Sequence, residues 1–233
     1  MIEIIKLDYK VIYLTKAIIV LSDIKKIYDI SPPLSEKIGV FPGDTPFTSS
    51  EVLSFEKGHN LRLSHIKTTV HLGAHTDAPS HYHKDGKTIE AQDLEIYLGE
   101  CQIVDVSKAK GPRILESDID DEISSSRVLF KTDSFPDPDS WNSDFFAFDP
   151  ELIEFLSKKG VRLIGIDTPS VDVESDKSLL THNQIYKHDM AILEGIVLKE
   201  VPVGFYELIA LPLPIVGADA SPVRAILLEK GNK

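Results

Sequence analysis

The most informative stretch of this chain is Thr69-Val70-His71-Leu72-Gly73-Ala74-His75-Thr76-Asp77-Ala78-Pro79-Ser80-His81. Its β-branched residues, together with Gly73 and Pro79, disfavour a helix, so an extended chain is predicted. Even spacing places four side chains on one side of an extended chain: His71, His75, Asp77 and His81. A straight strand would spread them over roughly 33 Å, so the chain is expected to bend at Gly73 and Pro79.

The residue types in this stretch indicate a metal site. Neutral imidazole and carboxylate are the usual ligands of zinc and of similar divalent cations. A set of three protein ligands, His71, His75 and Asp77, matches a catalytic site that leaves one position open to water. The alternative is a scatter of surface histidines or of core histidines with satisfied hydrogen bonds. Clustering in one short, bent segment favours the metal site over that alternative.

Outward from this stretch, short β-rich segments alternate with few helices, which predicts an α/β or α+β fold. The clearest helix covers Pro150–Lys159, with Asp149 as its N-cap and Gly160 just after its end. Buried or partly buried strands are predicted for residues 161–166, 206–213 and 223–229. An N-terminal β-rich extension, with a strand or hairpin over residues 11–21, is expected to precede the main domain.

Composition limits the class of protein. The chain has 233 residues, of which 42% are hydrophobic and 27% are charged, as in ordinary globular domains. The formal net charge of -12 disfavours partners such as nucleic acid or an anionic membrane surface. Charged residues interrupt the N-terminal segment, so neither a signal peptide nor a membrane span is expected. The single cysteine, Cys101, cannot form an internal disulfide, and a cytoplasmic location is therefore expected.

At the histidine stretch the chain resembles the cyclase-like metal-dependent hydrolases and, within them, the bacterial kynurenine formamidases. Their signature, His-x-Gly-Thr-His-x-Asp-x-Pro-x-His, is matched by residues 71–81 with Ala74 in place of the threonine. The likeness runs from about residue 28 to the end of the chain. It is carried further by residues 29–34, 42–47, 97–99, 165–170 and 220–225.

This resemblance implies a swivelling β/β/α single domain, here residues 26–233, preceded by the extension of residues 1–25. It also implies a homo-oligomer, a dimer or tetramer, with two divalent metal ions per subunit. Zinc is the expected metal and manganese the alternative. The ligands that the family implies are His71, His75, Asp77, His182 and Glu194, with both carboxylates bridging the metals. His81 is then the acid/base histidine that binds no metal.

The function that the resemblance implies is hydrolysis of a small amide, N-formyl-L-kynurenine, to kynurenine and formate in tryptophan breakdown. His81 would protonate the departing amine. Phe41 stands where these enzymes carry a tryptophan that packs against the substrate, so it is the candidate substrate-binding residue. Because phenylalanine offers less area and no N–H donor, a two-metal hydrolase of another amide, an isatin-like lactam or an ester stays open. A metal-binding module without turnover is the other alternative, and His81 argues against it.

Other residues favour structural explanations. Trp141 is expected to anchor a surface loop, with a pocket lid as the alternative. Acidic clusters at residues 116–122 and 172–176 are predicted to be solvated. His59 and His65 are also predicted to lie on the surface, and Cys101 is expected to be a core thiol.

Overall fold

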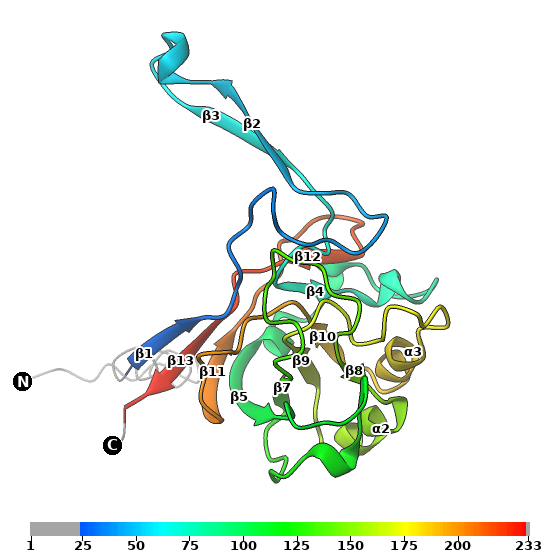
Figure 1. Cartoon of the computed structure of the whole chain (residues 1–233). Coiled ribbons are helices and arrows are strands. Elements are labelled where there is room, and N and C mark those ends of the chain that lie inside the picture. The colour runs from blue at the N-terminus through cyan, green and yellow to red at the C-terminus, as the bar shows by residue number, and fades with distance from the viewer. Residues whose placement is uncertain (1–23, 232–233) are drawn as a thin grey trace, which may run out of the picture.

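A computed structural model describes residues 24–231 of the chain (Figure 1). The extension predicted for residues 1–25 therefore lies outside the description, apart from the first two residues of strand β1. The strands are β1 (Ile24–Asp29), β2 (Thr48–Leu53), β3 (Leu63–Lys67), β4 (His75–Asp77), β5 (Leu98–Asp105), β6 (Arg113–Ile114), β7 (Arg127–Lys131), β8 (Ala147–Phe148), β9 (Leu163–Ile166), β10 (Ala191–Leu193), β11 (Gly204–Ile209), β12 (Ala220–Pro222) and β13 (Ile226–Lys230). The α-helices are α2 (Pro150–Lys158) and α3 (Leu180–Lys187).

The main sheet has the strand order β1-β13-β11-β5-β7-β9-β10 and confirms the mixed α/β class. From β1 to β5 neighbouring strands are antiparallel, and from β5 to β10 they are parallel. Three further pairs form two-stranded sheets: β4 with β12 at the site, β2 with β3, and β6 with β8. Strands from both ends of the chain thus lie next to one another.

The parallel half of the sheet is buried on both faces, which explains its continuous apolar runs. Along β7, Val128 and Phe130 pack into one core and Leu129 into the other. Helices α2 and α3 cover the first of these faces (Figure 1). The second face is covered by the loops and strands that lead to the histidine stretch.

Helix α2 forms where the sequence predicts it. The Asp149 side chain accepts a hydrogen bond from the Glu151 N–H at 2.9 Å, and Pro150 occupies the first turn. Leu152 and Leu156, one turn apart, are buried against the sheet. The helix ends at Lys158, and Gly160 follows with a φ of 83°, the left-handed conformation that ends many helices.

The predicted strands exist, but their ends differ from the expectation. β9 begins at Leu163 rather than at residue 161, and β11 ends at Ile209 rather than at residue 213. β11 stops before Pro212 and Pro214, which have no N–H to donate to a neighbouring strand. β13 begins only at Ile226, because the Ala225 N–H donates to the Ser31 hydroxyl at 2.7 Å instead.

The hairpin of β2 and β3 projects from the body (Figure 1), and we refer to residues 48–67 as the arm. Its strands are exposed, except that Leu53 is half-buried, and it includes His59 and His65, whose predicted exposure is confirmed. Large apolar side chains are also exposed on it: Val52, Phe55, Leu61, Leu63 and Ile66. Within residues 24–231, every helix is too short or too polar to cross a bilayer.

Candidate metal centre

The histidine stretch adopts the bent, extended path that its sequence predicts. Gly73 has a φ of 56°, and Pro79 begins a short 3-10 turn that ends at His81. Between the two bends lies β4, whose three residues are all buried, His75 and Asp77 among them. The bends bring the ends of the stretch together, so that the rings of His71 and His81 lie 4.2 Å apart between centroids.

Glu194, which follows the last residue of β10, lies beside His75 of the histidine stretch. The backbones of His75 and Glu194 exchange two hydrogen bonds, of 3.0 Å and 2.9 Å. This close approach requires glycine at position 195, since a Cβ there would lie 2.1 Å from the Gly73 carbonyl oxygen. The backbone therefore fixes the Glu194 carboxylate beside β4.

The Asp77 carboxylate lies between histidines on two sides. Its Oδ1 is 2.9 Å from His71 Nδ1 and 3.6 Å from His75 Nε2. Its Oδ2 is 3.4 Å from His182 Nε2. Both oxygens are buried, and neither has a hydrogen-bond partner among residues 24–231.

The Glu194 carboxylate has the same arrangement. Its Oε2 is 3.1 Å from His75 Nε2, and its Oε1 is 4.0 Å from His182 Nε2. Each carboxylate thus turns one oxygen toward His75 and the other toward His182. A pair of carboxylates in this position can hold two cations between them.

Hydrogen bonds outside the centre orient two of the imidazoles. His75 Nδ1 donates to the Gly73 carbonyl at 2.9 Å, and His182 Nδ1 donates to Asp172 Oδ2 at 2.8 Å. In both rings the proton is held on Nδ1, which leaves Nε2 free to bind a metal. Asp172 in turn accepts from the backbone N–H groups of Thr181 and His182.

Charge within the centre shifts the pKa values. Burial raises the pKa of Asp77, but the neighbouring imidazoles of His182 and His71 hold it well below its ordinary value. Burial lowers the pKa of His71, yet Asp77 and Asp219 outweigh this effect and raise it to about 9. For His182, burial is likewise outweighed by Asp172 and Asp77, and the pKa rises to about 10. Without a metal, protons on His71 and His182 therefore balance the charge of the carboxylates, and a bound cation would take the place of these protons.

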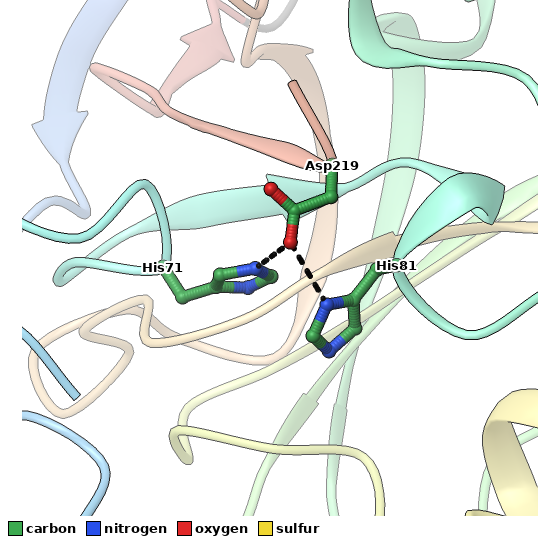
Figure 2. Close-up of side chains that lie close together, drawn as sticks. All are labelled: His71, His81 and Asp219. Carbon is green, nitrogen blue, oxygen red and sulfur yellow. Dashed lines mark hydrogen bonds and ion pairs between the residues drawn. The ribbon is translucent and has the colours of Figure 1, made fainter. Parts of the chain in front are cut away.

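His81 and His71 share a third carboxylate, that of Asp219 (Figure 2). The Oδ2 atom of Asp219 is 3.2 Å from His81 Nδ1 and 3.1 Å from His71 Nε2. His81 is more exposed than the residues of the centre, with 33% of its side chain accessible against 3% for His75. Its ring therefore stands at the rim, where a substrate can reach it.

The residues present fit a metal centre. Two carboxylates buried side by side, one of them without hydrogen bonds among the described residues, are costly without a cation. Ligand atoms of His71, His75 and Asp77 lie within 4.8 Å of one another, as do those of Asp77, His81 and His182. These distances suit a cation on the side of His75, and on the side of His182 they bring His81 within reach of the same position.

A small cavity of about 60 Å³ adjoins this centre. His71 and His75 line one part of it, and Phe41 and Trp141 line another. The expectation that Trp141 only anchors a surface loop is therefore wrong, and its position corresponds to the pocket alternative. Phe41 stands at the cavity, as a candidate substrate-binding residue should.

Sequence reasoning missed two carboxylates of the site. The prediction that residues 172–176 form a solvated cluster fails at Asp172, which is 2% exposed and orients His182. Asp219 lies in a turn of residues 217–219 that gave no functional signal. The prediction for Cys101 is confirmed, since it is fully buried.

Comparison with known proteins adds independent information. Residues 28–173 match the family model described as "Putative cyclase". A "Kynurenine formamidase" of Maricaulis maris (strain MCS10) is 43% identical over 206 residues, which is 88% of this chain and 98% of that protein. A "Kynurenine formamidase" of Bordetella petrii is 44% identical over 209 residues, 89% of this chain and all of that protein.

A solved structure agrees with the sequence relatives. The "predicted metal-dependent hydrolase" from Bacillus stearothermophilus is 30% identical, with a TM-score of 0.76. The match covers 88% of this chain and 98% of that one. The fold of this chain thus occurs in a solved protein described as a predicted metal-dependent hydrolase.

Proposed function

Because this chain belongs to the cyclase family, we propose that it hydrolyses the formamide bond of N-formyl-L-kynurenine to give kynurenine and formate. The chain is an amidohydrolase of the kynurenine formamidase type. One observation carries the proposal: the carboxylates of Asp77 and Glu194 lie between histidines, beside a cavity lined by aromatic rings. The identity to formamidases favours this reaction over hydrolysis of a lactam or an ester.

The centre is proposed to hold two divalent cations, with zinc expected. Asp77 and Glu194 would bridge them, while His71 and His75 bind on one side and His182 on the other. The position of both carboxylates between the imidazoles supports this assignment. When bound, such cations lower the pKa of water and polarise a carbonyl oxygen.

Protonation of the leaving group is the role that we propose for His81. Hydrolysis breaks the bond between the formyl carbon and the amide nitrogen, and the leaving nitrogen must gain a proton to depart as an amine. His81 Nδ1 faces Asp219, which leaves Nε2 on the other edge of the ring for the substrate. Asp219 holds the ring in this orientation, so we regard it as a positioning residue for His81.

The proposal is tested by formate release from N-formyl-L-kynurenine, measured with chelator-stripped protein before and after zinc or manganese is added back. We expect no turnover in the stripped protein and rapid turnover after metal is restored. Isatin and an aryl ester serve as parallel substrates. Metal-restored hydrolysis of these alone would refute the formamidase assignment and keep the metal chemistry.

The chain is further proposed to form a homo-oligomer through the arm. A two-stranded hairpin is marginally stable alone in water, and this one exposes five large apolar side chains, among them Phe55 at 63% and Ile66 at 60%. The arm also carries three cationic against two anionic side chains, while the whole chain has a net charge of -12. A second copy of this chain therefore offers the complementary charge.

We expect light scattering to give the mass of a dimer or larger assembly, and Phe55→Ser combined with Ile66→Ser to shift it toward the monomer. Val216→Ser is the control, because Val216 is 86% exposed and lies outside the arm. A monomeric parent protein would overturn this proposal.

A further inference from the structure

The cavity beside the metal centre has an aromatic wall whose key member is Trp141. Phe41 meets Trp141 edge to face, with ring centroids 5.3 Å apart and planes at 72°. Phe135 and Phe145 pack on it in the same manner, at 5.8 Å and 6.0 Å. Three rings thus fix the indole, which is half-buried and lines the same cavity as His71 and His75.

A hydrogen bond also fixes the indole from across the site. Trp141 Nε1 donates to Glu174 Oε2 at 2.9 Å and lies 3.3 Å from Ser143 Oγ. Glu174 belongs to the loop that follows Asp172, and it lines the space around His81 and His182. The contact therefore joins two loops, one on each side of the centre.

The loop that carries Trp141 is anchored at its base. Thr132 donates to the Asp167 carboxylate through both its N–H and its hydroxyl, and the Asp133 N–H donates to the same carboxylate. Further along, the Asn142 amide donates to the Ser134 carbonyl at 3.1 Å. The indole is thus positioned before a ligand arrives, which reduces the entropy lost on binding.

We propose that Trp141, positioned by Glu174, is the residue that makes this enzyme prefer aromatic substrates. The inference rests on the proposed function and deepens it. Since the indole N–H is already bound to Glu174, Trp141 offers a ligand its ring carbons, which suit stacking on another aromatic ring. An alkyl group of equal size would be buried in the same cavity, but it would not stack on the indole ring of Trp141.

The kinetic test compares formanilide, which has an aromatic ring, with N-cyclohexylformamide, which has a saturated one. Their leaving amines also differ in basicity, but this difference is the same for the parent and the variant and cancels when the two ratios are compared. In the zinc-loaded enzyme, Trp141→Leu is expected to lower the ratio of their kcat/KM values by roughly three- to tenfold, the strength of one aromatic pair. Most of the change should appear in KM, because the centre itself is untouched. An unchanged ratio would overturn the proposal.

Variants at Glu174 separate positioning from folding. Glu174→Gln keeps an oxygen that accepts the indole N–H and should retain the parent ratio. Glu174→Leu removes the acceptor and should lower the ratio in the same direction as Trp141→Leu. If the two Glu174 variants gave equal ratios of kcat/KM, the hydrogen bond between Trp141 and Glu174 would have no part in specificity.

A second readout does not depend on turnover. The sequence has 1 tryptophan, so intrinsic tryptophan fluorescence reports on Trp141 alone. We expect acetanilide to change this emission in a saturable way. N-cyclohexylacetamide should do the same with an affinity roughly three- to tenfold weaker. No change with acetanilide, or equal affinities, would overturn the proposal. Saturable binding of acetanilide, together with no release of formate from N-formyl-L-kynurenine, would instead refute the proposed reaction and keep the aryl site.

Discussion

Asp77→Asn is expected to remove metal from the centre and to lower kcat/KM for N-formyl-L-kynurenine by about a thousandfold or more. Asp77 is the only group that faces His71, His75 and His182 at once among the described residues. Asparagine keeps the shape of the side chain but cannot place a negatively charged oxygen on each side. Metal content measured by mass spectrometry should therefore fall well below that of the parent.

The control for this variant is Asp120→Asn, which removes one negative charge from an exposed position. It should keep the metal content and activity of the parent protein, because its charge is screened by solvent. A full complement of metal in Asp77→Asn would contradict the bridging role that we assign to Asp77.

His81→Asn is expected to lower kcat by about a hundredfold to ten-thousandfold, the usual contribution of a general acid, while metal content stays at the parent level. This combination of results separates His81 from the ligands, whose loss removes metal. His83→Ala is the matched control, since His83 stacks on Tyr186 at 3.9 Å outside the centre. Loss of metal in His81→Asn would make His81 a ligand rather than an acid.

The choice of leaving group sharpens the His81 test. 4-Nitroformanilide releases a weakly basic amine that needs less help from an acid than aniline does. The loss of kcat in His81→Asn should therefore be smaller with 4-nitroformanilide than with formanilide. An equal loss with both substrates would mean that His81 does not protonate the leaving nitrogen.

The part of the site that lies in one segment could be predicted from the sequence. The residue types and spacing between His71 and His81 indicate both the ligands and the bends, because the chemistry and the backbone geometry are local. The same is true of α2, whose cap, first proline and final glycine act within a few residues.

The contributions of Asp172 and Asp219 could not be predicted, because they depend on tertiary contacts. Asp172 stands in an acidic run that looks solvated, yet it is buried against α3, a helix for which the sequence gave no clear signal. Asp219 reaches His81 across a long separation in sequence. Trp141 is similar: its loop is rich in proline and aspartate, and only the packing of Phe41 and Phe135 shows that it faces the cavity.

The pairing of β1 with β13 and of β4 with β12 has a consequence for the order of events during synthesis. The strand that carries His75 and Asp77 is translated well before its neighbour β12 and before Asp219. While β12 and β13 are still inside the ribosome, the main sheet is open at its antiparallel edge, and β4 can pair only with Glu194 at the end of β10. The pairing that places Asp219 beside His81 is therefore completed only after residues 220–222 have been translated, later than all five proposed ligands.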